Sequence, residues 1–323
     1  MMRESELLSQ IRAVFDQHVT KPEIIVGNGD DGAVISTHGK LIVATDVAVE
    51  GVHFRREWSS GFEVGRKITA ANLADICAMG GWPEFLLVTA VIPDRWAGEA
   101  LALAEGIAHE ANLVGATVVG GDLSHGKELS ISITAMGHCD KTLQRSGAKI
   151  GDSVVVSKIP GWSAAGLELL KAGKKIVTEL QNRAISEHRT PTLEYEKYHS
   201  AISPLSCAID VSDGLVIDSS RIAQASDVTI ELDSRFLVDE DLAKLAESMS
   251  SNAMEWTLNG GEDHVLLGTT SYPELCRGFY VIGRVGERTK SLVTLDGAAI
   301  SLQGYEHQWR PERADVSERP FQP

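Results

Sequence analysis

Carboxylates near expected chain turns, most of them beside glycines, are the residues of this sequence with the clearest chemical content. A carboxylate at a strand end that is followed by glycine is held firmly while the backbone turns away from it. Several such groups, if they converge, supply the oxygen ligands that Mg²⁺ prefers and bridge more than one ion to a nucleotide triphosphate. This inventory suits phosphoryl transfer, in which a protein contributes mainly positioning and charge neutralisation. The five segments are Gly29-Asp30-Asp31-Gly32, Ala44-Thr45-Asp46, Gly120-Gly121-Asp122, Asp210-Val211-Ser212-Asp213-Gly214 and Gly260-Gly261-Glu262-Asp263.

Each of these residues, taken alone, also has a purely structural interpretation. A single Asp-Gly pair is most often a turn, because Asp caps the backbone and Gly supplies a positive φ. Asp75 shares a predicted helix face with Asn72, but by itself it is most often a solvated acid or a cap. His53, taken alone, is more often a structural histidine than a ligand. Arg145, taken alone, is by default a surface charge, although an arginine beside a phosphate site can form a bidentate clamp. Spacing alone therefore leaves a metal–phosphate site and a set of unrelated turns as equal alternatives.

Two familiar phosphate-binding loops do not fit the sequence. Gly27, Gly29 and Gly32 have the G-x-G-x-x-G spacing of a dinucleotide-binding loop, and acids follow about 20 residues later. The third glycine should open a helix that faces the pyrophosphate, yet it leads into the apolar, β-branched run 33–36. Two carboxylates inside the loop would also repel the pyrophosphate. The chain has no G-x-x-x-x-G-K-[ST] motif. If this protein is a kinase, it must therefore bind phosphate by another design.

Composition narrows the class of protein further. The 323 residues suffice for two domains, and no apolar run approaches the ~20 residues of a membrane span. The net charge of −15 lacks the basic footprint of a nucleic-acid binder, and an acidic protein that binds a phosphorylated ligand needs divalent cations locally. The N-terminus has no signal-peptide pattern. The 4 cysteines form no C-x-x-C pair, which indicates a reducing, cytoplasmic setting.

Periodicity predicts a chain in which helices and strands alternate. Helices are expected over 1–20, 63–79, 96–113, 163–172 and 216–225, and strands over 40–43, 86–92, 117–119, 129–137, 153–157, 228–232, 264–269 and 280–285. The strands 40–43 and 117–119 are expected to end just before their acids. The alternation indicates two α/β or α+β domains, 1–145 and 146–310, followed by a charged tail, 311–323.

Seven motifs, in this order, carry a resemblance to a known family. They are GDDGAVI, ATDVAVEGVHF, NLADICAMGGWP, VGGDLS, RSGAKIGD, AIDVSDGL and NGGEDHVLL. Together they resemble the thiamine-monophosphate kinase family, of the superfamily that includes aminoimidazole ribonucleotide synthetase. The likeness continues to 304–307 and covers almost the whole chain. One motif alone would be weak, whereas the ordered set, VEGVHF with GGED above all, is highly specific.

The resemblance implies a fold and a reaction. The fold would be a two-domain, synthetase-like α/β fold, whose N-terminal sheet pairs with that of a second copy to form a barrel in a homodimer. ATP and several Mg²⁺ ions would lie in the cleft between the domains. The γ-phosphoryl group of ATP would pass to thiamine monophosphate, giving thiamine diphosphate and ADP. The substrate phosphate is itself the nucleophile, so no strong general base is needed.

The resemblance also implies roles for individual residues. The metal ligands would be Asp31, Thr45, Asp46, Asp75, Asp122, Asp210 and Asp213. The ATP contacts would be Gly121, Asp122, Arg145 and Ser212, with Asp122, Arg145 and Asp213 in the catalytic roles. The substrate contacts would be His53, Glu262 or Asp263, and Tyr305. An acid suits a cationic thiazolium and an aminopyrimidine, and a tyrosine suits stacking on such a ring.

The sequence differs from the family pattern at two places, and other functions remain as alternatives. Ala44 stands where many relatives carry a hydroxyl, and the segment after Arg189 lacks the family's basic Pro-Arg pattern. A selenophosphate synthetase would want a reactive cysteine in its N-terminal segment, and a hydrogenase-maturation protein would want one at its C-terminus; neither is present. An aminoimidazole ribonucleotide synthetase-like enzyme is the alternative within the superfamily. A non-catalytic protein that binds Mg²⁺ and nucleotide is the alternative of another class.

Overall fold

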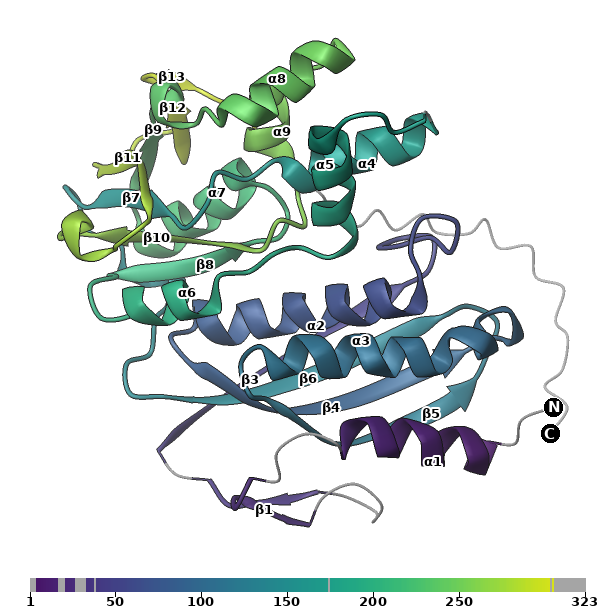
Figure 1. Cartoon of the computed structure of the whole chain (residues 1–323). Coiled ribbons are helices and arrows are strands. Elements are labelled where there is room, and N and C mark those ends of the chain that lie inside the picture. The colour runs from purple at the N-terminus through teal and green to yellow at the C-terminus, as the bar shows by residue number, and fades with distance from the viewer. Residues whose placement is uncertain are drawn as a thin grey trace, which may run out of the picture.

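Two β-sheets, one in each half of the chain, organise the part of the protein that the computed structural model describes (Figure 1). These residues are 4–16, 21–26, 33–37, 39–173, 175–302 and 304. The mixed α/β class predicted from the alternation of helices and strands is confirmed. The boundary between the predicted domains stays a prediction, and the tail 311–323 lies outside the described residues. Within the described residues no helix is long and apolar enough to cross a membrane.

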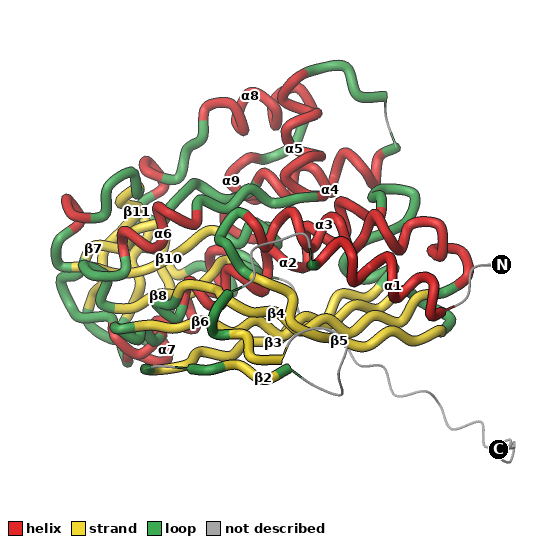
Figure 2. Tube along the Cα trace, turned by 60° about the horizontal axis from the view of Figure 1, so that its bottom comes forward, coloured by secondary structure: helices red, strands yellow, loops and turns green. Residues whose placement is uncertain are grey.

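The N-terminal half is built on a four-stranded sheet. Its order is β3 (Lys40–Val49), β6 (Ser130–Cys139), β4 (Trp82–Ile92), β5 (Thr117–His125). Helices α2 (Gly61–Ala78) and α3 (Ala100–Asn112) cover one face, and α1 (Glu4–Phe15) packs against α3 and β5 (Figure 2). A short 3₁₀ helix, η1 (Asp94–Glu99), precedes α3, and strands β1 (Ile24–Val26) and β2 (Val34–Ile35) form a separate ribbon.

Helix α2 owes its start and its close packing to particular residues. Ser60 and Glu63 form a capping box, in which each side chain satisfies a backbone N–H of the first turn. Gly65 lets α3 approach, because a Cβ at this position would lie 2.2 Å from the carbonyl oxygen of Leu103. The same holds for Gly106 of α3, where a Cβ would lie 2.1 Å from the carbonyl oxygen of Phe62. Small residues thus bring the two helices into backbone contact.

The C-terminal half is built on a seven-stranded sheet. Its order is β13 (Ala298–Ala299), β12 (Val293–Leu295), β9 (Thr229–Leu232), β11 (Tyr280–Gly286), β7 (Ser153–Val156), β10 (Val265–Thr270), β8 (Cys207–Val211). All neighbours are antiparallel except β9 and β12. Its helices are α4 (Trp162–Ala172), α5 (Glu179–Arg189), α6 (Tyr195–Ala201), α7 (Leu215–Ser226), α8 (Glu240–Met249) and α9 (Ala253–Asn259), with 3₁₀ turns η2 (Arg145–Gly147), η3 (Ser234–Phe236) and η4 (Pro273–Leu275).

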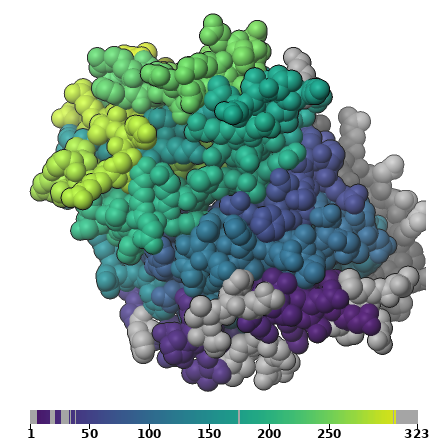
Figure 3. Space-filling model, in the orientation of Figure 1, coloured from purple at the N-terminus to yellow at the C-terminus, as the bar shows by residue number. Residues whose placement is uncertain are grey.

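The two halves share one hydrophobic core. Leu73 and Ile76 of α2 belong to the same buried cluster as Tyr198 of α6, Ala208 of β8 and Leu266 of β10. The C-terminal half therefore rests directly on α2, and the two halves form a continuous surface in Figure 3. Helix α2 contributes both to the N-terminal core and to the junction.

Two strand predictions are wrong in a way that matters for the site. Strand β3 does not end before its acid but continues to Val49, because it pairs with β6 along its whole length, Asp46 opposite Ile133. Strand β5 does not stop at Gly120 but continues to His125 beside β4, after an irregularity in register. The predicted helix 96–113 is η1 followed by α3. Helices α5, α6, α8 and α9 and strands β8, β12 and β13 lie outside the predicted segments.

Candidate active site

Acids from both halves of the chain come together where β3, α2 and β8 meet. Asp46 lies on the face of β3 that α2 covers, and its backbone N–H donates to Asn72 Oδ1 of α2 at 3.0 Å. Asp75 follows on the same helix. Asp210 lies near the end of β8, and its Oδ2 is 3.1 Å from Nδ1 of His264, just before β10. The structure thus brings three of the predicted metal carboxylates into one neighbourhood.

Burial and neighbouring charges raise the pKa of two of these acids, Asp75 and Asp46. Burial, then Asp210 and Asp46, raises the pKa of Asp75 to about 8. Loss of solvent raises the pKa of Asp46 as well, and Asp210 adds to this against the opposing effect of His264. Burial by itself lowers the pKa of His264, but its hydrogen bond with Asp210 raises it overall. A cluster that resists ionisation in this way is suited to cations, which remove the mutual repulsion.

The donor groups of this cluster are carboxylate oxygens, the ligand type that Mg²⁺ prefers. In the described residues, no three histidine, cysteine or acidic side chains stand close enough to ligate one ion by themselves. Mg²⁺ does not require such a set, because it is commonly held by one or two carboxylates, several waters and phosphate oxygens. Asp46, Asp75 and Asp210 offer oxygen donors of this kind, so the residues fit ions that bridge the protein to a phosphorylated ligand.

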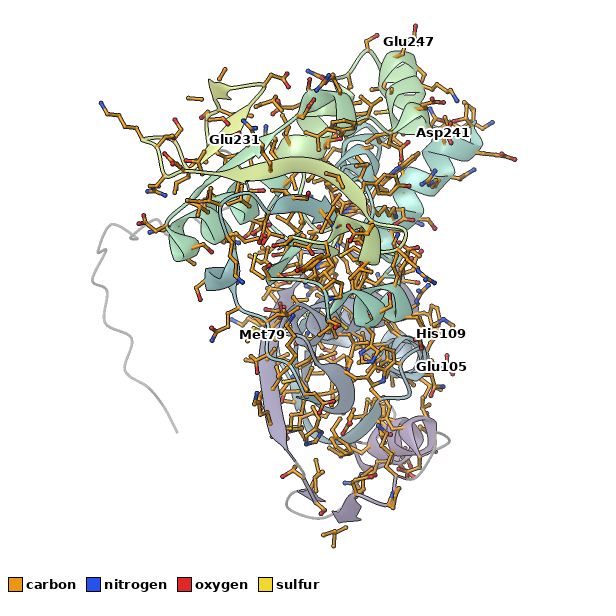
Figure 4. All side chains as sticks on the ribbon, turned by 90° about the vertical axis from the view of Figure 1, so that its left-hand side faces the viewer. Met79, Glu105, His109, Glu231, Asp241 and Glu247 are labelled. Atoms are coloured by element: carbon orange, nitrogen blue, oxygen red, sulfur yellow. The ribbon has the colours of Figure 1, made fainter. Side chains whose placement is uncertain are left out.

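A groove of about 460 Å³ gives access to this cluster. Asp75 and Met79 of α2, Ala44 of β3, Asp210 of β8 and Arg145 are among its lining residues. Figure 4 labels Met79 at the level where the two halves meet, on the side of the molecule away from His109 of α3. Arg145 lies close enough to Asp75 for its charge to oppose the rise in that carboxyl's pKa. The groove therefore combines carboxylates with one accessible guanidinium.

The loop between β8 and α7 is organised by an acid that the sequence analysis did not single out. Oδ2 of Asp218, a fully buried residue, accepts the backbone N–H groups of Ser212, Asp213 and Gly214 at 3.1, 3.1 and 3.2 Å. Arg221 donates to Asp218 and, at 2.6 Å, to Oδ2 of Asp213. Asp213 therefore reaches this site already paired with an arginine. An acid in the first turn after Ser-Asp-Gly was the available sequence signal.

The two adjacent acids Glu262 and Asp263 have different surroundings. Asp263 is buried, and its two carboxylate oxygens accept the backbone N–H groups of Gly161 and Ser163 at 2.8 and 3.2 Å, so it caps α4. Glu262 pairs with Lys67 of α2 at 2.9 Å, and its side chain keeps 30% of its exposure. Of the two, Glu262 is the acid accessible to a ligand.

His53 lies in the turn after β3, with its ring orientation set by the backbone. Its Nδ1 is 3.0 Å from the backbone N of Val49 and accepts that N–H. In the neutral ring the proton then resides on Nε2, which makes Nε2 a hydrogen-bond donor.

Two predicted residues do not join the acidic cluster within one chain. Thr45 alternates with Asp46 and lies on the opposite face of the sheet, where its hydroxyl donates to the carbonyl oxygen of Ile133 at 3.0 Å. Asp122 lies in β5, at the other edge of the sheet from β3. Registers run from Asp46 through Ile133 and Val88 to Gly121, three strand spacings or about 14 Å. That span is too long for one ion.

Gly121 and Asp122 instead adjoin a second cavity of about 450 Å³. Leu8 and Phe15 of α1 and Leu103 of α3 line it with them, together with other apolar side chains. In the described part of the chain, Asp213 follows the end of β8 as expected, whereas Asp46 and Asp122 lie inside strands. Asp31 and Tyr305 lie outside the described residues.

Comparison with known proteins gives this geometry its context. Residues 29–139 match the N-terminal domain, and residues 149–296 the C-terminal domain, of AIR synthase related proteins. Thiamine-monophosphate kinase of Mycobacterium tuberculosis (strain ATCC 25618 / H37Rv) is 39% identical over 269 residues, 81% of this chain and 79% of that protein. Thiamine-monophosphate kinase of Bacillus subtilis (strain 168) is 35% identical over 92% of this chain and 98% of that protein.

Solved structures agree in fold. AaThiL complexed with AMPPCP and TMP superposes with a TM-score of 0.79 at 32% identity, covering 95% of this chain and 99% of that one. Hydrogenase maturation protein HypE in complex with ATP gives a TM-score of 0.71 at 16% identity, which shows a shared fold alone. From the family models and the curated relatives, the chain belongs to the thiamine-monophosphate kinase family of AIR synthase related proteins.

Proposed function

We propose that this protein transfers the γ-phosphoryl group of ATP to thiamine monophosphate, with thiamine diphosphate and ADP as products. The observation that carries the proposal is the groove that Asp75, Asp210 and Arg145 line from both halves of the chain, with Asp46 close to these two acids. The solved relative that holds AMPPCP and TMP supports it, since AMPPCP is a non-hydrolysable counterpart of ATP.

The chemistry needs little from the protein beyond position and charge. An oxygen of the acceptor phosphate attacks the γ-phosphorus, the bond from that phosphorus to the β-bridging oxygen breaks, and ADP leaves with the electron pair. Mg²⁺ supplies charge neutralisation between the two anions. Its ligands in this proposal are Asp31, Asp46, Asp75, Asp122, Asp210 and Asp213, with an oxygen of Thr45.

Five further side chains hold the reactants in this proposal. Arg145 donates to phosphoryl oxygens from the groove, and Ser212 offers a hydroxyl beside Asp213. His53 donates from Nε2 to the acceptor phosphate, because its Nδ1 already accepts a backbone N–H. Glu262, the accessible acid of its pair, accepts hydrogen bonds from the acceptor's ring, which Tyr305 stacks against.

A homodimer completes the proposal. Asp122 and Asp46 lie at opposite edges of the four-stranded sheet, so a second copy is needed to place β5 beside the acidic cluster. The face of the sheet away from α2 also exposes apolar side chains, among them Leu41, Val43 and Val47 at 43, 58 and 52%. An apolar face of this kind favours burial against another protein surface. The nucleotide would extend from Gly121 and Asp122, whose cavity has apolar walls suited to a base. The reducing, cytoplasmic setting stays a prediction.

One assay tests the reaction. Purified protein is incubated with ATP, Mg²⁺ and thiamine monophosphate, and thiamine diphosphate and ADP are measured by chromatography. Equal amounts of both products are expected, and none without Mg²⁺. If no thiamine diphosphate forms, and ATP is converted to ADP only when aminoimidazole precursors are supplied, the chain belongs instead to the synthetase branch.

A further inference from the structure

Lys67 is a buried lysine on α2 whose ammonium group crosses from the N-terminal to the C-terminal half. Its side chain keeps 9% of its exposure, and its ammonium group contacts residues of the C-terminal half. Nζ donates to the carbonyl oxygen of His188 in α5 at 2.9 Å and pairs with Oε2 of Glu262 at 2.9 Å. Because a buried ammonium group is costly without a partner, the lysine depends on both contacts. Neither contact is needed to form α2.

Glu262 is held in an unusual backbone conformation beside this lysine. Its φ is 63°, in the left-handed region that residues other than glycine adopt only when their surroundings impose it. Its backbone N–H donates to the carbonyl oxygen of Ser212 at 2.7 Å, which connects it to the loop before α7. The described polar contacts of its carboxylate, to Lys67 and His188, are made by Oε2, while 30% of the side chain is exposed.

His188 does not share the charge of the lysine. Its Nδ1 is 3.0 Å from Oγ of Ser163 and 3.7 Å from Oε2 of Glu262. Burial, and next the charge of Lys67, lowers its pKa to about 3, so the ring is neutral at neutral pH. The ring of Trp58 packs edge-on against it, with 6.5 Å between centroids. Among these groups, Lys67 supplies the positive charge that Glu262 faces.

We propose that Lys67 is a positioning residue for the acceptor substrate, which holds Glu262 ionised and turned so that its other oxygen accepts a hydrogen bond from an N–H group of the acceptor's aminopyrimidine. The inference rests on the proposed function. Lys67 and Glu262 together carry no net charge. Recognition at this point therefore depends on the direction of a hydrogen bond more than on attraction of a cation.

The test is a double-mutant cycle on the full-length protein. The variants are Lys67→Met, which keeps the length of the side chain without its charge, Glu262→Gln, and the two combined. Lys67→Met and Glu262→Gln are each expected to raise the KM for thiamine monophosphate by about tenfold or more, the size of a lost hydrogen bond to a charged group. The KM for ATP should change by less than about twofold. The combined variant should be no worse than Glu262→Gln alone, because Lys67 acts through Glu262.

A neighbouring arginine provides the matched control. Arg66 precedes Lys67 on α2 and pairs with buried Glu110 of α3 at 2.8 Å, away from the groove. Arg66→Met should lower the melting temperature and leave both KM values unchanged. If Lys67→Met does not fold, Lys67→Gln, which is neutral but keeps a hydrogen-bond donor, takes its place with an expected intermediate KM.

The outcomes separate the two proposals. A wild-type protein that forms no thiamine diphosphate overturns the proposed function. If the wild type forms it but Lys67→Met leaves the KM for thiamine monophosphate within about twofold, the positioning role is wrong. Single-variant effects that multiply in the combined variant would also contradict it, because they show independent action.

Discussion

At the scale of single residues, the acidic cluster changes the proton binding of its own members. Asp75 has its pKa raised to about 8, so in the absence of cations the folded protein holds a proton there that the unfolded chain would release. Between the ordinary pKa of an aspartate, about 4, and this value, the folded state binds more protons than the unfolded state. The contribution of Asp75 to stability is therefore greatest at low pH and declines as the pH rises towards 8.

This sign gives a prediction for thermal unfolding. Without added cations, the melting temperature should fall as the pH is raised from about 6 to about 9. Mg²⁺ should raise the melting temperature more at the higher pH, because fewer of the Asp75 carboxyl groups then carry a proton that the ion must displace. Asp75→Asn should flatten the pH dependence and reduce the shift with Mg²⁺. Asp94→Asn, at an acid with a side chain 97% exposed, is the control and should behave as the wild type. Equal Mg²⁺ shifts in wild type and Asp75→Asn would exclude Asp75 as a ligand.

At the scale of elements, α2 determines where the site can form. The helix carries Asn72 and Asp75 to β3, Lys67 to the C-terminal loops, and its glycine-lined side to α3. Its position is fixed by the backbone approach at Gly65 and Gly106, which leaves no room for a Cβ. A shift of α2 would therefore move Asp75, a proposed metal ligand, together with Lys67, the partner of Glu262.

Substitution of Gly106 tests this packing. Gly106→Ala should destabilise the protein by about 2 kcal/mol, because the new Cβ meets the carbonyl oxygen of Phe62 and overpacking outweighs the better helix propensity of alanine. Gly98→Ala in η1 is the control, since its Cβ would meet nothing within 4 Å. The free energy of unfolding in urea measures both. A Gly106→Ala protein as stable as Gly98→Ala would show that α3 is free to move away.

At the scale of the whole molecule, one chain by itself does not assemble all the residues of the proposed site. Asp122 lies three strands from Asp46, and the uncovered face of the sheet presents Val47 at 52% exposure on the strand that carries Asp46. We propose that association of two copies through this sheet accounts for both the separation and the apolar face.

A charge on that face should separate the copies. Val47→Asp is expected to give a monomer by size-exclusion chromatography with light scattering, and to reduce turnover by at least about a hundredfold, the scale of a lost electrostatic contact in the transition state. Val238→Asp, at a valine 56% exposed in the C-terminal half, should remain dimeric and active. A monomeric Val47→Asp protein with wild-type turnover would show that Asp122 is dispensable or reaches the site within its own chain.

The sequence by itself determined the alternation of helices and strands, the family and the candidate acids, because these depend on residue type, local periodicity and ordered motifs. It placed α2, β4 and β6 well, since their patterns are long and regular. It ended β3 and β5 too early, because glycines and acids resemble turns locally, whereas pairing with β6 and β4 keeps the strands extended.

Only the tertiary structure decided how the candidate residues divide. Asp263 and Glu262 are neighbours in sequence, yet one caps α4 and the other faces Lys67, which lies 195 residues away along the chain. Asp46, Asp75 and Asp210 meet, whereas Asp122 lies across the sheet and Asp213 is paired with Arg221. These outcomes depend on strand order and on contacts between distant segments, which local residue patterns do not encode.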